Sequence, residues 1–212
     1  MLCEGQNDKV FLHETLTYKL NVDPTHIKTY QEARSLKRDI RSNRWKRISI
    51  LETGGFPQLI KIAVRLTRQF WYLRTSLSMW VIADSDKGPV FNKLVEYMDE
   101  YLKTQCKRHN VNPQFIWCES KQKIIVSFRD ERKIAIWVLE IPESLETKVS
   151  RALKSKYASL RSINTDDETI RAASNLLGIN RKEVIRRSVR LLENERWFSD
   201  FCSKLERNIN HR

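Results

Sequence analysis

The feature that most constrains the fold is a continuous apolar run, residues 79–83, that ends directly at acidic residues. Five apolar residues without polar alternation are typical of a strand covered on both faces, as in a parallel sheet. Residues 48–51 form a second strand-like run, and residues 1–3 form a short one at the start of the chain. The pattern therefore predicts three strands of a mostly parallel sheet.

Segments with helical periodicity alternate with these strands. Leu12, Leu16 and Leu20, for example, are spaced by four residues and share one face of a predicted helix over 8–20. Similar patterns predict helices over 57–70 and 91–102 and further strands over 115–118, 123–128 and 133–139. The alternation predicts an α/β fold: a Rossmann-like, mostly parallel sheet flanked by helices, with an antiparallel edge where a short turn joins 115–118 to 123–128.

The pattern after Pro142 is entirely helical, with helices expected over 143–158, 167–177 and 181–206. We therefore expect an α/β core over residues 1–142 and a helical C-terminal extension over residues 143–212. Within the core, residues 28–47 are interpreted as an exposed, partly helical, basic insertion.

Composition narrows the class of protein. Of the 212 residues, 41% are hydrophobic, enough to build a core, and this excludes global disorder. No apolar run approaches the roughly 20 residues of a membrane span, and the first residues lack the pattern of a secretory signal. The four cysteines are widely scattered, which argues against a disulfide framework or a zinc site. We expect a reduced, soluble, cytoplasmic protein without a membrane partner.

The formal net charge of +13 is concentrated in two regions. Residues 28–47 carry eight Lys or Arg against two acids, and the tail from residue 151 carries 14 against eight. Such regions attract polyanions, and nucleic acid, DNA or RNA, is the expected partner; a plain solvated surface is the alternative. In the first region Tyr30 and Trp45 could add base stacking. The candidate phosphate-binding residues there are Arg41, Arg44, Lys46 and Arg47.

Three acidic residues follow two of the predicted strands. Glu4 follows the first strand, and Asp84 and Asp86 follow the run 79–83. Because ligands of open parallel sheets bind beyond the carboxyl ends of the strands, these acids are expected to converge at one edge. Crowded carboxylates repel unless a cation lies between them, and oxygen ligands suit Mg²⁺, with Mn²⁺ as a substitute. The pattern predicts a divalent-metal phosphate site.

These residues also form motifs. C-E-G-x-x-D at residues 3–8, a strand–Gly-Gly–helix unit around residues 48–70, and V-I-A-D-S-D at residues 81–86 occur in this order. Together, over about residues 1–140, they resemble the Toprim domain of topoisomerases, DnaG-type primases, OLD-family nucleases and a ribosomal-RNA maturation nuclease. The resemblance implies metal-dependent phosphodiester chemistry.

Carried over by position, the resemblance implies that Glu4 is the acid/base residue and that Asp84 and Asp86 bind Mg²⁺. Asp8 corresponds to the extra acid of the nuclease-like branches. The matching turn glycines are Gly5, Gly54 and Gly55.

Other positions near these motifs have two interpretations each. Glu140, Glu143 and Glu146 are weaker candidates for a further metal ligand, or they simply favour the N-terminus of the next helix through its dipole. Lys87 directly follows the acids and either contacts phosphate or is a solvated lysine.

Several Toprim activities are excluded by what the chain lacks. It is too short for a topoisomerase gate, shows no polymerising body of a primase, and contains no GxxxxGK[ST] motif for an attached ATPase. A small standalone nuclease-like protein is the enzyme hypothesis that remains. The alternative, from another class, is a non-catalytic nucleic-acid-binding or regulatory protein.

The tail supports that alternative. Ser174, Gly178 and Val184 have the spacing of a helix-turn-helix, which would direct Arg181, Lys182 and Arg186 into a DNA groove. Gly178 equally fits an ordinary helix C-terminus. In that case the C-terminal helices pack on the core or form a homodimer interface.

Overall fold

The computed structural model describes residues 1–42, 44, 47–70, 77–107, 114–127 and 133–209. The chain divides into two compact units. The first comprises Met1–Gly5 and Lys28–Glu140, and the second comprises Gln6–Ile27 and Ile141–Arg212. In the described part of the chain, no helix is both long and apolar enough to cross a membrane.

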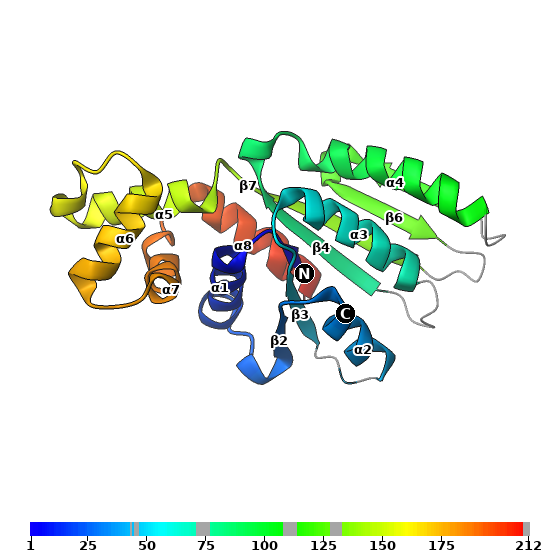
Figure 1. Cartoon of the computed structure of the whole chain (residues 1–212), viewed down its shortest axis with the longest axis horizontal. Coiled ribbons are helices and arrows are strands. Elements are labelled where there is room, and N and C mark those ends of the chain that lie inside the picture. The colour runs from blue at the N-terminus through cyan, green and yellow to red at the C-terminus, as the bar shows by residue number, and fades with distance from the viewer. Residues whose placement is uncertain (43, 45–46, 71–76, 108–113, 128–132, 210–212) are drawn as a thin grey trace. The chain divides into compact units, whose positions relative to one another are not determined.

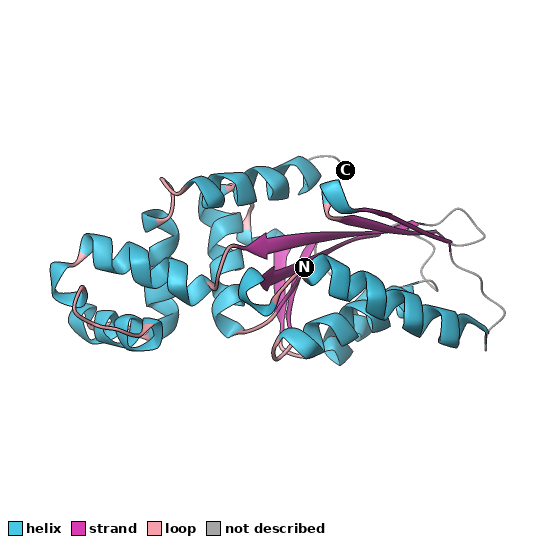
Figure 2. Ribbon diagram, turned by 90° about the horizontal axis from the view of Figure 1, so that it is seen from above, coloured by secondary structure: helices cyan, strands magenta, loops and turns pink. Residues whose placement is uncertain are grey.

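The first unit is a Rossmann-like α/β fold built on a seven-stranded, mostly parallel sheet with an antiparallel edge, as predicted (Figures 1 and 2). The strand order is β2-β3-β1-β4-β7-β6-β5. β5 pairs with β6, and β6 with β7, in antiparallel fashion. The strands are β1 (Leu2–Cys3), β2 (Ile27–Tyr30), β3 (Ile48–Glu52), β4 (Leu77–Asp84), β5 (Gln114–Cys118), β6 (Lys123–Ser127) and β7 (Lys133–Ile141).

β1 has only two residues, yet it lies between β3 and β4 and pairs with both in parallel. Leu2 is aligned with Leu51 of β3 and Val81 of β4. The terminal ammonium of Met1 donates to the carbonyl of Ser49 at 2.6 Å, which extends the pairing beyond the strand. Because Leu2 and Cys3 are both buried, this short strand is covered on both faces.

Three helices belong to the first unit: α2 (Ala33–Arg41), α3 (Phe56–Phe70) and α4 (Val90–Lys107). α3 and α4 pack side by side along one face of the sheet (Figure 2). Their contact residues repeat with helical period, as predicted from the sequence. These fully or nearly fully buried residues are Leu59, Ala63 and Leu66 of α3 and Phe91, Leu94 and Met98 of α4.

The second unit consists of helices α1 (Gln6–Glu14), α5 (Leu145–Lys156), α6 (Asp166–Leu177), α7 (Arg181–Leu191) and α8 (Arg196–Ile209), with a π-helical segment (Thr15–Lys19) after α1. Phe11 of α1 is fully buried among aromatic rings of α8. Its ring centroid lies 6.3 Å from that of Trp197 and 5.8 Å from those of Phe198 and Phe201. α1 therefore shares a core with the C-terminal helices, whereas the sequence analysis places it in a domain over residues 1–142.

Two elements differ from the predictions. β2 lies in the segment interpreted as a basic insertion; its sequence, IKTY, has apolar residues only at its ends, too few to produce a recognisable strand pattern.

The helix predicted over 181–206 is two helices, because the chain turns after Leu191 and α8 begins at Arg196. No glycine or proline marks this turn. The break lets α8 direct Phe198 and Phe201 toward Phe11.

The aromatic cluster generates a stability prediction. Phe11→Ala removes a fully buried ring and leaves a cavity, so we expect the free energy of unfolding to fall by about 3–5 kcal/mol. Tyr18→Ala, in the following π-helical segment, removes a ring that is 38% exposed and serves as the control. Denaturant titration measures both; equal effects of the two substitutions would contradict the shared core of α1 and α8.

Candidate functional site

Two of the predicted acids lie at the carboxyl ends of neighbouring strands. Glu4 follows β1 directly, and Asp84 is the last residue of β4. The backbone N–H of Asp84 donates to Oε1 of Glu4 at 3.1 Å. Parallel pairing of β1 with β4 thus brings together two residues that are 80 positions apart in the chain.

The pair lies where the sheet changes its direction of winding. From β1 the chain proceeds to β2 and β3 on one side, and it then crosses to β4 on the other side of β1. In open α/β sheets such a switch point leaves a crevice outside the carboxyl ends of the two central strands, and ligands bind there. Glu4 and Asp84 are the residues at these ends.

The predicted Gly-Gly turn is hydrogen-bonded to the backbone of Glu4. Both backbone N–H groups, of Gly54 and Gly55, donate to the carbonyl oxygen of Glu4, at 2.9 and 2.8 Å. The φ angles of the two glycines are +84° and +108°, a region that side chains disfavour. A Gly-Gly pair is therefore required for the turn that fixes the backbone of Glu4 and then begins α3.

Asp86 lies in a short 3₁₀ turn (Ser85–Lys87) between β4 and α4 and is exposed. The side chain of Lys87 lies outside the described part of the structure. A further acid approaches this loop from β7: Oε1 of Glu140 accepts a hydrogen bond of 3.0 Å from the backbone N–H of Val90, the first residue of α4. Glu140 thereby satisfies one of the unpaired N–H groups at the start of α4.

The donor chemistry fits Mg²⁺, although not as a closed protein cage. Among the described residues, no group of three or more His, Cys, Asp or Glu side chains is arranged to hold a metal ion. Asp84 and Asp86 offer carboxylate oxygens at and just after the end of β4, and the backbone of Asp84 is hydrogen-bonded to Glu4. Mg²⁺ in proteins commonly takes one or two carboxylates and completes its shell with water and substrate phosphate.

The other acids considered as ligands belong to the helical unit. Asp8 is buried in the first turn of α1. Glu143 accepts two hydrogen bonds from Arg151, at 2.7 and 2.9 Å, and pairs with Lys148 at 3.1 Å. Lys148 first and Arg151 second lower the pKa of Glu143. Oε1 of Glu146 accepts from the side chain of Asn7 at 2.7 Å, which joins α5 to α1.

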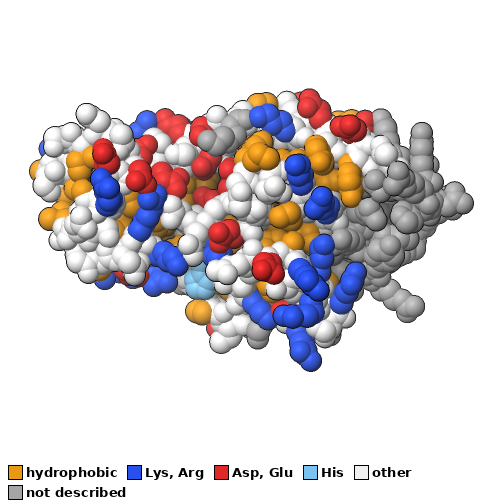
Figure 3. Space-filling model, in the orientation of Figure 1, with side chains coloured by type: hydrophobic (Ala, Val, Ile, Leu, Met, Phe, Trp, Pro, Cys, Tyr) orange, Lys and Arg blue, Asp and Glu red, His pale blue; other side chains and the backbone are white. Residues whose placement is uncertain are grey.

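A basic surface surrounds α2 in the first unit (Figure 3). The pKa of Lys37 is lowered, first by partial burial and then by the positive charges of Arg41 and Arg65. Arg65, on α3, was missed by the sequence analysis, although Lys61 and Arg65 are four residues apart and share one helix face. We call the following residues the α2 basic surface: Arg34, Lys37, Arg38, Arg41, Arg44, Arg47 and Arg65. Lys46 and Trp45, predicted to join it, lie outside the described residues.

One buried carboxylate anchors α2 to the edge strand β2. Oδ2 of Asp39 accepts from Nζ of Lys28 at 2.5 Å and from the hydroxyl of Tyr30 at 3.1 Å. Tyr30 is only 4% exposed. The expectation that Tyr30 stacks on a base is therefore wrong: its ring is buried in the core, where its hydroxyl holds α2.

The helix-turn-helix prediction concerns α6 and α7. Gly178 ends α6 with φ +63°, and the side chain of Asn180 caps α7 by accepting from the N–H of Glu183. Of the three candidate groove residues, Lys182 is exposed, Arg181 pairs with Asp167, and Arg186 pairs with Glu14 and Glu183.

Burial, followed by the contact with Asp39, raises the pKa of Tyr30 to about 12 from its ordinary 10.0. As the pH rises, Tyr30 therefore loses its hydroxyl proton at a lower pH in the unfolded chain than in the folded protein. The folded state loses stability as the pH rises from about 10 to about 12. Tyr30→Phe should remove this loss of stability at alkaline pH, whereas the control Tyr157→Phe should retain it. Chemical denaturation across this pH range measures the effect; an identical loss in Tyr30→Phe would refute the assignment.

No protein-family model, no curated protein and no solved structure matches this chain. The interpretation of the site therefore depends on the residues of the chain itself: the Glu4–Asp84 hydrogen bond, the Gly-Gly turn against Glu4, and the α2 basic surface.

Proposed function

We propose that this protein carries out Mg²⁺-dependent phosphodiester chemistry on nucleic acid, as a small Toprim-like nuclease. The observation that carries the proposal is the 3.1 Å hydrogen bond from the backbone of Asp84 to the carboxylate of Glu4. It brings together two acids from distant parts of the chain, at the crevice where open α/β sheets bind ligands.

In this proposal Asp84 and Asp86 would hold the metal. Bound Mg²⁺ would neutralise phosphate oxygens and stabilise charge on the attacking or leaving oxygen. Glu4 moves the proton of the nucleophile, and the Asp84 N–H holds one of its oxygens in place while it does so. Positioned acid/base groups of this kind typically contribute about 10²–10⁴-fold in rate.

The α2 basic surface supplies the attraction for a polyanion. Partial burial first, and the positive charges of Arg41 and Arg65 second, lower the pKa of Lys37, and the approach of a phosphate backbone relieves the repulsion among these cations. Such binding depends on charge rather than on base sequence, and it weakens steeply with salt. A nuclease with little sequence preference would use the surface in this way.

Cleavage assays test the metal site directly. Supercoiled plasmid, single-stranded DNA and structured RNA are each incubated with the protein, with and without Mg²⁺ or Mn²⁺. We expect cleavage that needs the metal and falls about 10²–10⁴-fold in Glu4→Gln, which retains an oxygen acceptor for the Asp84 N–H while removing the carboxylate base. Asp84→Asn and Asp86→Asn should lose activity by weakening metal binding.

Glu96→Gln, an exposed substitution on α4, is the matched control and should leave cleavage unchanged. Persistence of cleavage in both aspartate variants would discredit the proposed site. Binding of nucleic acid without cleavage in any metal supports the second candidate function, a non-catalytic binding or regulatory protein. The specific observation in its favour is the three-residue connection of α6 to α7, capped by Gly178 and Asn180.

The α2 basic surface has its own test. Arg41→Gln with Arg44→Gln removes two exposed cations, so binding of single-stranded DNA should weaken and the slope of log K against log salt should become shallower by about one for each lost phosphate contact. Fluorescence anisotropy over a range of salt concentrations measures this slope. Lys121→Gln, exposed between β5 and β6, is the control; an unchanged slope in the double variant would count against the surface.

A further inference from the structure

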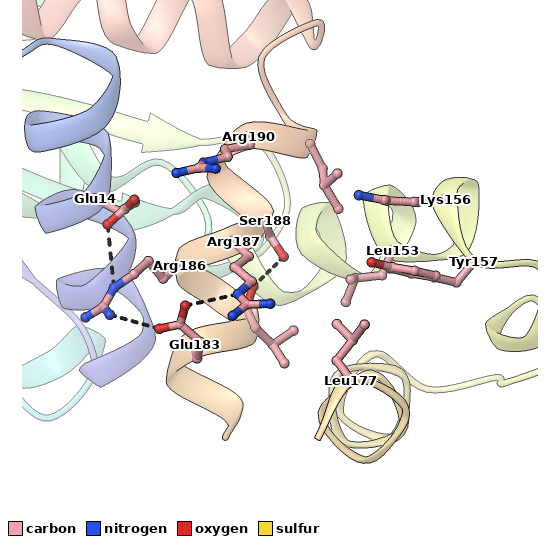
Figure 4. Close-up of a pocket in the computed structure, with 12 residues that line it drawn as sticks. Glu14, Leu153, Lys156, Tyr157, Leu177, Glu183, Arg186, Arg187, Ser188 and Arg190 are labelled. Atoms are coloured by element: carbon pink, nitrogen blue, oxygen red, sulfur yellow. Dashed lines mark hydrogen bonds and ion pairs between the residues drawn. The ribbon is translucent and has the colours of Figure 1, made fainter. Parts of the chain in front are cut away.

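A second site is formed wholly within the helical unit. A pocket of about 450 Å³ lies among α1, α5, α6 and α7 (Figure 4). Its volume is within the range of roughly 300–1,000 Å³ typical of small-molecule sites. α7 forms one wall and the C-terminal end of α5 forms the opposite one, with Leu177 of α6 beside them.

The wall formed by α7 carries three arginines: Arg186, Arg187 and Arg190. Nη1 of Arg186 pairs with Oε2 of Glu183 at 2.8 Å, and Nε of Arg187 pairs with Oε1 of the same carboxylate at 3.1 Å. The Arg187 contact is made through Nε, which leaves its two terminal nitrogens outside this pair. One glutamate thus orients two guanidinium groups at the pocket.

Two further cations, Lys156 and Arg190, line the pocket. In the described part of the chain, no carboxylate lies within ion-pair distance of Lys156 or Arg190. Lys156 lies over the ring of Tyr157, with Nζ 5.5 Å from its centroid, and the guanidinium of Arg190 lies 4.6 Å from the ring centroid of Tyr18. Among the described residues that line the pocket, four are cations and two, Glu14 and Glu183, are carboxylates. The pocket therefore favours an anionic ligand.

The remaining surface of the pocket is apolar and aromatic. Leu153 and Tyr157 come from α5 and its C-terminus, and Leu177 is the last residue of α6. The side chain of Tyr157 extends from α5 toward α7, so that its ring and Arg187 lie on opposite sides of the pocket (Figure 4). A ligand that fits both walls needs an anionic group and a flat apolar group a short distance apart.

We propose that this pocket binds a nucleotide, with its phosphate at Arg187 and Lys156 and its base against Tyr157, Leu153 and Leu177. Arginine binds phosphate through two parallel N–H groups, and an aromatic ring offers a stacking surface for any base. The proposal goes beyond the metal-dependent chemistry above, because it concerns another unit of the chain and requires neither Mg²⁺ nor Glu4. The nucleotide is either a free molecule or a residue of a single strand.

Isothermal titration calorimetry without divalent metal tests the proposal on the full-length chain. AMP, ATP, adenosine, inorganic phosphate and a short oligo-dA are titrated separately. We expect a nucleotide to bind more tightly than adenosine or phosphate alone. Adenosine contacts only the apolar side of the pocket, and phosphate contacts only the cationic side. Preference for AMP or ATP identifies a free nucleotide, and preference for the oligonucleotide identifies a strand.

Variants locate the binding. Arg187→Gln and Lys156→Gln should each weaken nucleotide affinity by about ten- to a hundredfold, as expected for the loss of a hydrogen bond to a charged group. Tyr157→Leu keeps an apolar side chain but removes the stacking surface. It should weaken the binding of AMP more than the binding of phosphate. Arg171→Gln, exposed on α6 and outside the pocket lining, should bind as the unaltered protein does.

Circular dichroism checks that each variant is folded. The proposal is overturned if no nucleotide or oligonucleotide binds at millimolar concentration, or if binding is the same in Lys156→Gln, Tyr157→Leu and Arg171→Gln. These outcomes are independent of the cleavage assay, because no metal is present and no residue of the Glu4–Asp84 pair is altered.

Discussion

The candidate site of the first unit depends on a strand of two residues. β1 occupies the centre of the sheet and is hydrogen-bonded to β3 and β4 on its two sides. Because parallel neighbours present their carboxyl ends at the same edge, this one strand brings Glu4 to Asp84 and to the Gly54–Gly55 turn. Burial of Leu2 and Cys3 and the pairing of the Met1 ammonium with Ser49 compensate for the shortness of the strand.

Charge is divided unequally within the first unit. Glu4 and Asp84 lie together at the ends of β1 and β4, whereas cations are concentrated on α2 and the adjoining residues. The buried Asp39, held by Lys28 and Tyr30, is an acid used for structure, since it fixes α2 to β2. Glu4 and Asp84 lie instead at the carboxyl ends of two neighbouring parallel strands, and we propose a chemical role for them.

The helical unit uses charged side chains differently. Glu183 joins Arg186 and Arg187, and Glu14 joins the same Arg186 from α1, so that acidic residues orient the cations of α7. Ion pairs between exposed side chains contribute little to stability. Their more important effect here is to position guanidinium groups around a pocket whose other cations, Lys156 and Arg190, are not balanced by a carboxylate in the described structure.

Strands and helices with strong periodicity could be predicted from the sequence alone. The apolar run 79–83, the apolar stripe of α3 and the Gly-Gly turn each have a local physical cause, so neighbouring residues suffice to identify them. Local sequence also placed Glu4 and Asp84 at strand ends. The tertiary structure decided what depends on distant partners: that α1 packs with α8 through Phe11, that Tyr30 is buried against Asp39, and that Arg187 and Tyr157 face one pocket. Such contacts join residues whose own neighbourhoods carry no sign of them, because packing between elements is set by the whole fold and not by periodicity.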